Sequence, residues 1–308
     1  PLNNDFDPSG GILVLQSVSA PPDSGVTVTV VDHSLLQITA ASTVPANLTV
    51  DYTVTNGTSS ATGKVAIVPV TQSQPQPPVV TNDTAVVRAG DVVTVPVLDN
   101  DSSPSGLNLS VDSQVSLVGD ELGTAWVSED TLRFRAGDQP GRTSYAYTAK
   151  DDQGQTASGV VTVEVRAQDA EHNSAPSPRN LEARTVAGSS TNITVPLDGI
   201  DPDGDSVSLV GLNQAPSLGS VEVNSSWLTY KPSEGASGTD TFTYVVEDRF
   251  GAQSTGTVRV GVAQSSPLNV APVATDDLVV AKPGRTVAVD VLSNDLDTDG
   301  DTLSLEGD

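Results

Sequence analysis

The sequence of 308 residues contains no cysteine and no methionine, and it has only two histidines, His33 and His172. Without cysteine, the chain cannot form disulfides, bind a metal through thiolates or use a thiol as a nucleophile. Two histidines at unrelated positions cannot supply a repeated histidine metal site or a repeated catalytic triad.

Basic residues are scarce as well: 14 Lys and Arg stand against 39 Asp and Glu, which gives a net charge of −25. Nucleic-acid-binding proteins need basic patches that displace counterions from phosphates, so we expect no nucleic acid as partner. No apolar run approaches the roughly 20 residues that span a bilayer, so we expect no direct membrane insertion of this chain. The acidity instead favours binding of cations such as calcium.

Signals of targeting and of catalysis are also missing. The chain begins at Pro1 without a signal peptide, and we expect it to be an internal part of a longer protein. No nucleophile-elbow motif is present, and in so acidic a chain close carboxylate pairs arise without any catalytic use. Aromatic residues make up only 4% of the chain, so we predict that Trp126 and Trp227 pack in cores. We predict that the protein is not an enzyme.

What the sequence does contain is an internal repeat. Similar segments recur at a spacing of about 96 residues, and several landmarks keep this one period, which indicates tandem units. The landmarks are Leu2, Leu98, Leu197 and Leu292; Tyr52, Tyr147 and Tyr244; and Gly57, Gly154 and Gly251.

The repeat divides the chain into four segments. Residues 1–74 are a partial unit that lacks its first strands, and residues 75–166 and 167–264 are complete units. Residues 265–308 contain only the opening strands of a further unit. Proline-bearing linkers precede the later units, and proline favours stiff, extended chain, so we expect an elongated rod.

Each unit shows the pattern of short β-strands. Residues 161–165 read Val-Thr-Val-Glu-Val, an alternation that is typical of a strand with one buried and one wet face. Seven such strands in about 95 residues indicate an all-β fold of tandem immunoglobulin-like β-sandwiches. In the second unit we predict strands at 84–88, 92–98, 107–118, 123–127, 131–136, 143–150 and 158–165. We interpret the repeated tyrosine either as a tyrosine corner, whose hydroxyl bonds backbone upstream, or as an aromatic residue of the core.

The openings of the later units resemble a known family. Ala271-Pro272-Val273-Ala274-Thr275-Asp276-Asp277, followed by Val291-Leu292-Ser293-Asn294-Asp295, is similar to the start of bacterial Ig-like or cadherin-like tandem repeats. Pro176 to Asp205 is similar too. The resemblance implies a very large secreted or cell-surface bacterial protein, and hence an extracellular location.

The third unit carries a candidate calcium site. Calcium takes six to eight oxygen ligands, mainly carboxylates and carbonyls. Asp201, Asp203 and Asp205 lie in one loop, which should share an end of the sandwich with the turn at Asp248. The linker adds Asp169, Glu171 and Asn173, and the resemblance implies a similar division of ligands at cadherin-like joints. The alternative is a solvated turn with no metal.

A second acidic run occurs in the fourth segment. It fits the EF-hand loop pattern, but a strand pattern precedes it, so we reject the EF-hand fold and keep a calcium-binding β-loop as an open alternative. The candidate ligands there are Asp295, Asp297, Asp299 and Asp301. The first joint, whose linker at residues 72–78 has no acidic residue, should be poorer in metal.

These observations favour a non-catalytic structural role. The units would form a spacer or stalk of an adhesin-like surface protein, with calcium stiffening some joints. Two alternatives stay open: a binding module for an unidentified surface glycan or protein, and accessory domains of a secreted hydrolase. Residues 265–308 could also add strands to residues 1–74 of a neighbouring molecule, which would give head-to-tail self-association.

Overall fold

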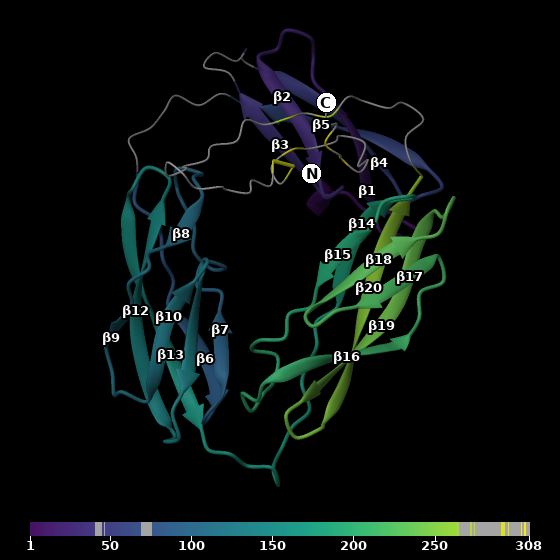
Figure 1. Cartoon of the computed structure of the whole chain (residues 1–308). Coiled ribbons are helices and arrows are strands. Elements are labelled where there is room, and N and C mark those ends of the chain that lie inside the picture. The colour runs from purple at the N-terminus through teal and green to yellow at the C-terminus, as the bar shows by residue number, and fades with distance from the viewer. Residues whose placement is uncertain are drawn as a thin grey trace, which may run out of the picture.

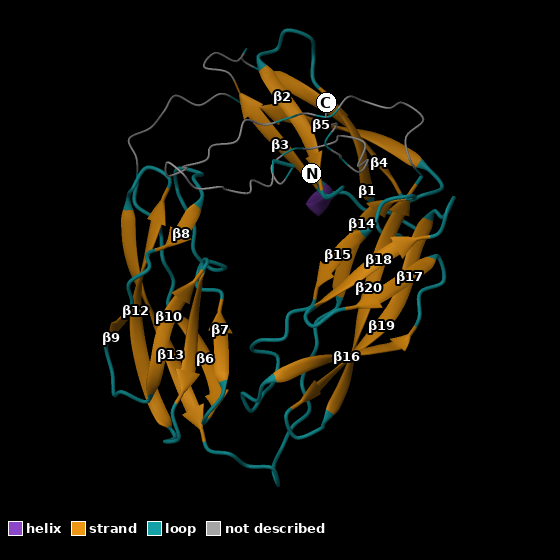
Figure 2. Ribbon diagram, viewed as in Figure 1, coloured by secondary structure: helices purple, strands orange, loops and turns teal. Residues whose placement is uncertain are grey.

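The computed structural model is almost entirely β, as Figure 2 shows. It describes residues 1–40, 45, 47–68 and 76–264, and the single residues 272, 274, 291, 292, 295, 303 and 305. Within that part of the chain the only helix is the single 3₁₀ turn η1, Leu2–Asn4. No helix there is long and apolar enough to cross a membrane.

The second unit is a complete sandwich of two sheets. One sheet has the order β6-β13-β12-β8, with β9 pairing with β12, and the other has the order β10-β11-β7. Its first strand, β6, runs parallel to the last strand, β13. Its strands are β6 (Asp83–Arg88), β7 (Val92–Val95), β8 (Leu109–Val111), β9 (Ser116–Leu117), β10 (Gly123–Ser128), β11 (Thr131–Ala136), β12 (Gly141–Asp151) and β13 (Thr156–Arg166).

One predicted strand of this unit differs from the structure. The sequence predicted a single strand at 107–118, but the structure has β8 and β9 with a break between them. The Asp112 carboxylate accepts a hydrogen bond from the backbone N–H of Gln114 at 2.9 Å. Such a local side-chain bond competes with the ladder and ends β8 early.

The third unit repeats this architecture. Its sheets have the orders β14-β20-β19-β16 and β15-β18-β17, and β14 again runs parallel to the last strand. Its strands are β14 (Leu181–Val186), β15 (Thr191–Thr194), β16 (Val207–Gln214), β17 (Gly219–Val223), β18 (Trp227–Pro232), β19 (Gly238–Asp248) and β20 (Gln253–Ala263).

The repeated tyrosines lie in the cores, and those of the two complete units also bond upstream backbone, whereas Tyr52 donates to Asp5 Oδ2 at 2.8 Å. Tyr147 and Tyr244 are buried. The hydroxyl of Tyr147 donates to the Val97 carbonyl at 3.1 Å, and that of Tyr244 donates to the Arg179 carbonyl at 2.6 Å. In the two complete units both interpretations therefore hold, because the tyrosine is a core aromatic whose hydroxyl also bonds backbone upstream of its own strand.

The tryptophans, in contrast, are not core residues. Trp227 lies on β18 with 39% of its surface exposed. Trp126 on β10 is half-buried, and the guanidinium of Arg133 lies 5.8 Å from its ring centroid. The prediction of core packing was wrong because both side chains lie on the outer face of their strands. In short strands, the alternation of residues alone does not determine which face is buried.

The first unit has fewer paired strands. Its described sheets are β1-β4-β5 and β2-β3, and no described strand pairs with the outer edges of β3 and β5. Ile38 on β3 is 37% exposed, whereas its repeat counterparts Phe134 and Tyr230 are fully buried. Pairing of residues 265–308 with these edges in a neighbouring molecule stays a prediction. The strands are β1 (Val14–Ser19), β2 (Val26–Val31), β3 (Leu35–Ala40), β4 (Leu48–Thr55) and β5 (Ser60–Ile67).

The arrangement of the units differs from the elongated rod expected from the sequence. In Figure 1 the second and third units meet at their lower ends and diverge upward, and the first unit lies on the upper end of the third. The backbone N–H of Ile12 donates to the Thr239 hydroxyl at 2.8 Å, and Val14 shares a buried cluster with Val186 and Ala263. The apolar end of the third unit is buried by the first unit, and this contact turns the described chain back on itself.

Candidate metal centre between the second and third units

The acidic loop of the third unit is shaped by its first aspartate. The Asp201 Oδ1 atom accepts the backbone N–H groups of Asp203 and Asp205 at 2.9 and 3.0 Å. Gly204 has φ +83°, and a Cβ there would lie 2.7 Å from the backbone of Val87 in the second unit. Glycine is therefore required both by the left-handed backbone and by the close approach of the neighbouring unit.

This loop brings three carboxylates together. One oxygen each of Asp201, Asp203 and Asp205 can be chosen so that all lie within 4.8 Å of one another. Asp201 and Asp205 are both 6% exposed. The structure thus assembles the loop residues that the sequence predicted as ligands.

An arginine of the second unit enters the same cluster. Arg88, at the end of β6, is only 4% exposed. Its Nε atom donates to Asp205 Oδ2 at 3.2 Å, and one of its terminal nitrogens lies 3.7 Å from Asp203 Oδ2. Sequence reasoning missed this residue for two reasons. Its repeat counterpart in the third unit is Val186, so the arginine is not a repeated landmark. The way in which the two units pack depends on tertiary contacts that no local sequence pattern shows.

The linker and the β19–β20 turn complete the joint. The Nδ2 atom of Asn173 donates to Asp248 Oδ2 at 2.6 Å, and the backbone N–H of Ser174 donates to Asp203 Oδ2 at 2.7 Å. Asp248 Oδ1 closes its own turn by accepting the N–H groups of Phe250 and Ala252. The three groups that the sequence placed at this joint therefore meet there.

Several oxygens at this joint lack a hydrogen-bond partner. Within the described residues, buried atoms without one include Asp201 Oδ2, Asp205 Oδ1 and Asn173 Oδ1. Buried polar atoms are nearly always satisfied, so these oxygens, together with the equally unpartnered terminal nitrogen Nη2 of Arg88, mark a joint whose polar groups are incompletely paired. The carboxylates of Asp201, Asp203 and Asp205 could hold a metal ion.

The protonation of the cluster is set by burial. Burial raises the pKa of the Asp201 carboxyl, and the neighbouring Asp248 and Asp203 raise it further. Burial also raises the pKa of Asp205, against the opposing effect of Arg88. The pKa of Asp203 is lowered, mainly by the backbone N–H of Ser174. Two of the three loop carboxylates thus lack the stabilisation that their ionised forms need.

Two predicted linker ligands do not join the cluster. The Asp169 carboxylate accepts the N–H groups of Glu171 and His172 and so caps a turn of the linker itself. Glu171 is exposed. As ligands, Asp169 and Glu171 stay predictions that this structure does not bring to the cluster; the linker reaches it through Asn173 and Ser174.

Of the four predicted calcium ligands in the fourth segment, only Asp295 lies among the described residues. Asp297, Asp299 and Asp301 lie outside the described residues. Asp295 is described, and its backbone N–H donates to the Leu292 carbonyl at 3.3 Å. A calcium-binding loop in this segment stays a prediction.

The contact between the third and first units, the third–first joint, is built differently. The Nε atom of Arg184 donates to the Leu13 carbonyl at 2.7 Å, and Arg259 donates to the Gly10 carbonyl. A Cβ on Gly57, which has φ +91°, would lie 2.1 Å from the backbone N of Gly238. This joint uses hydrogen bonds from two arginine side chains to backbone carbonyls, together with apolar packing, and no carboxylate cluster lies there among the described residues.

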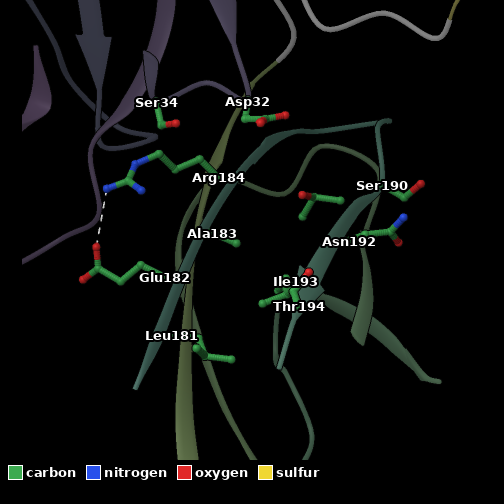
Figure 3. A pocket seen from close by; sticks show the side chains of 11 residues that line it. Asp32, Ser34, Leu181, Glu182, Ala183, Arg184, Ser190, Asn192, Ile193 and Thr194 are labelled. Atoms are coloured by element: carbon green, nitrogen blue, oxygen red, sulfur yellow. Dashed lines mark hydrogen bonds and ion pairs between the residues drawn. The ribbon is translucent and has the colours of Figure 1, made fainter. Parts of the chain in front are cut away.

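A cleft of about 470 Å³ lies beside the third–first joint (Figure 3). Arg184 crosses it and pairs with Glu182 at 3.4 Å. The other lining side chains are mostly polar and come from β14, β15 and the turn between β2 and β3. We assign this cleft to the joint, since its shape follows from the way the first unit sits on the third.

Comparisons with known proteins agree with the fold. The sequence profile of the bacterial Ig domain matches residues 75–164 and 173–261, which fall within the second and third units. No curated protein matches this chain.

Solved structures similar to this chain include several multidomain proteins. The immunoglobulin domains 1–4 of Sidekick-1 match with a TM-score of 0.35 and 14% identity, covering 86% of this chain and 68% of that one. Drosophila N-cadherin EC1–3 matches with a TM-score of 0.28 and 15% identity, covering 81% of this chain and 89% of the cadherin chain. An endo-fucoidan hydrolase of glycoside hydrolase family 107 matches with a TM-score of 0.30 and 17% identity. The match covers 84% of this chain and only 40% of the hydrolase.

Proposed function

Because the chain belongs to the bacterial Ig domain family, we propose that it is a non-catalytic structural spacer of a secreted or cell-surface bacterial protein, adhesin-like in organisation. Domains of this family are typical of surface and extracellular proteins. The support lies in the joints: neighbouring units are fixed by buried side chains instead of being linked by free chain. A spacer needs this property, because only fixed joints transmit position from one end to the other.

We further propose that calcium binds at the second–third joint. The observation that carries this is the set of three buried, unpartnered oxygens on Asp201, Asp205 and Asn173. Asp203 supplies a further carboxylate within reach, and water can complete the six to eight oxygens that calcium takes. The cluster also has the right charge: Asp201, Asp203, Asp205 and Asp248 face Arg88 and Arg166, which leaves an excess that one divalent cation neutralises.

Arg88 and calcium would then bind different oxygens of the cluster. The Arg88 Nε atom already pairs with Asp205 Oδ2. Asp205 Oδ1 and Asp201 Oδ2 have no hydrogen-bond partner among the described residues. A bound calcium would thus hold the loop to the linker, while Arg88 holds the loop to the second unit.

The test is calorimetric titration of the full chain with calcium. We expect binding that Asp201→Asn or Asp205→Asn weakens by about tenfold or more. Asp169→Asn is the matched control, since it removes an acid from the same linker outside the cluster. Wild-type affinity in the first two variants, or loss of binding in the control, would contradict the site.

The spacer role is tested by shape and by binding. Small-angle scattering should show a looser molecule after chelation, because removal of the ion leaves unpaired like charges at the joint. An unchanged maximum dimension would refute the calcium part. The chain should also show no retention on glycan arrays; clear retention would favour the binding-module alternative.

A further inference from the structure

The third–first joint connects two units that are not consecutive, because the second unit lies between them in the chain. Within the described residues, its hydrogen bonds and closest approaches come from residues 10–14 and Gly57 of the first unit and from the third unit alone. The second–third joint, in contrast, includes Asn173 and Ser174 of its own linker. The third–first joint is therefore a contact between the surfaces of two units, to which no described linker residue contributes.

The end of the third unit is shaped to receive the first unit. A Cβ at Gly261 would lie 2.8 Å from the side chains of Ile12 and Val14. The second unit has Glu164 at the equivalent place in the β12–β13 ladder, where the third unit has Gly261 in the β19–β20 ladder. A side chain of that size at residue 261 would fill the space that Ile12 occupies.

The bonds across this joint need no charge on the first unit. The backbone N–H of Ile12 donates to the Thr239 hydroxyl at 2.8 Å, and the Arg184 Nε atom donates to the Leu13 carbonyl at 2.7 Å. Val14 is fully buried in the apolar part of the contact. Repulsion between two copies, each with a net charge of −25, acts mainly through solvent, where physiological salt screens it over about 8 Å.

We propose that the same contact forms between two copies of this chain, with the first unit of each copy packed on the third unit of the other. Reciprocal exchange keeps every contact of the joint and removes the need for each chain to fold back. Within one chain the first unit competes at an effective concentration of about 1 mM, so exchange requires copies crowded to a similar concentration. The proposal rests neither on calcium nor on strand addition by residues 265–308.

Two backbone amides report on the joints separately. The N–H of Arg88 donates to the Gly204 carbonyl across the second–third joint at 2.8 Å, and that of Ile12 donates to Thr239 across the third–first joint at 2.8 Å. Hydrogen exchange at these amides in the full chain measures the opening of each joint. Exchange at Val260, in the core of the third unit, shows whether that unit stays folded.

The test is thiol cross-linking, because the chain has no cysteine of its own. A Cβ on Gly57 would lie 2.1 Å from the backbone N of Gly238, so the neighbouring positions Thr58 and Ser237 suit a short thiol-specific cross-linker. The full chain with Thr58→Cys is mixed with the full chain with Ser237→Cys at about 1 mM each, so that only contact between copies can join the two variants. Joined pairs should exceed by about tenfold those of a control that carries Val210→Cys instead of Ser237→Cys. Val210 is 52% exposed in the same unit, away from the joint.

Gly261→Glu gives the third unit the residue found in the second and fills the space for Ile12. In the Ser237→Cys chain it should reduce cross-linking to the level of the control. On its own it should raise exchange at Ile12 by about tenfold or more, as overpacking does, with exchange at residue 88 and at Val260 unchanged.

Cross-linking of the mixture at the control level would overturn the proposal, whether or not a single chain with both cysteines links within itself. Undiminished cross-linking in Gly261→Glu would overturn it too, since the pairs would then form without this contact. If Gly261→Glu removes protection at Val260, Ile12→Glu in the Thr58→Cys chain blocks the same space from the first unit. It should likewise reduce cross-linking to the control level, and full cross-linking would contradict the exchange.

Discussion

The second–third joint and the third–first joint hold equivalent ends of the same fold together by different chemistry. The first buries Arg88 against Asp203 and Asp205, and the second buries Val186 and Ala263 against Val14. Both keep a glycine at the closest approach, Gly204 in one joint and Gly57 in the other. The backbone thus sets where units meet, and a few side chains set how firmly and under which conditions they hold.

The difference should appear as different sensitivities. A buried ion pair is intolerant of losing one partner, because the remaining charge stays in a low-dielectric site. Apolar packing weakens in proportion to the surface that is lost and does not depend on pH or salt. The four predictions below run from the largest expected effect to the smallest.

The largest effect is expected for Arg88→Met. Removal of the guanidinium leaves buried carboxylates unpaired, and we expect the second–third joint to lose about 3–5 kcal/mol. Hydrogen exchange at residue 88 measures this loss. Arg142→Met is the matched control, because its side chain is 76% exposed on the same unit; it should change the joint by less than about 0.5 kcal/mol. Similar effects of the two variants would remove the basis of the comparison.

A smaller effect is expected for Val186→Ala at the other joint. Two buried methyl groups are lost, so the third–first joint should weaken by about 2 kcal/mol. Exchange at Ile12 reports it, and the loss should be the same in low and high salt. Val210→Ala, at a position 52% exposed in the same unit, is the control. A strong salt dependence would mean that charge also holds this joint.

The pH should separate the joints further. The pKa values of Asp201 and Asp205 are raised by burial. Without calcium, the folded chain therefore holds these protons more tightly than the unfolded chain. Their stabilising contribution is complete below the ordinary value of 3.8 and is lost as the pH rises through the raised values.

Calcium needs the ionised carboxylates, so its affinity should fall as the pH falls through the same raised values. Calorimetric titrations at a series of pH values check this. The protection factor of the Ile12 amide, which corrects for the pH dependence of intrinsic exchange, should not change over that range. A calcium affinity that is constant down to the ordinary aspartate pKa would show that Asp201 and Asp205 are not ligands.

The smallest effect is expected for Arg166→Ala. Arg166 donates to the Pro202 carbonyl at 2.8 Å and lies 3.7 Å from Asp203 Oδ1, but its side chain is 37% exposed. Ion pairs of this kind contribute about 0–1 kcal/mol and are screened by salt. Exchange at Arg88 should rise slightly in low salt and not at all in high salt. A loss as large as that of Arg88→Met would show that the two arginines act as one unit.

The repeat and the β class could be predicted from sequence because they depend on local alternation and on spacing. Asp201, Asp203, Asp205 and Asp248 could be placed at one end of the sandwich for the same reason. The part played by Arg88 could not, because it depends on a packing angle between units that no local pattern encodes.

The fold-back of the chain escaped prediction on similar grounds. Val186 and Ala263 read as ordinary ends of alternating strands, and nothing in the alternation shows that the first unit covers them. The proline-bearing linkers suggested stiffness, yet the direction of a joint follows from the side chains on both of its faces.

The most direct test compares hydrogen exchange at the Arg88 amide in the full chain with and without about 1 mM calcium. Calcium should slow this exchange and leave exchange at Ile12 unchanged, because the ion binds the acidic loop of the second–third joint alone. Equal rates at Arg88 in both conditions, in a chain whose core amides stay protected, would contradict a joint that is completed by a cation.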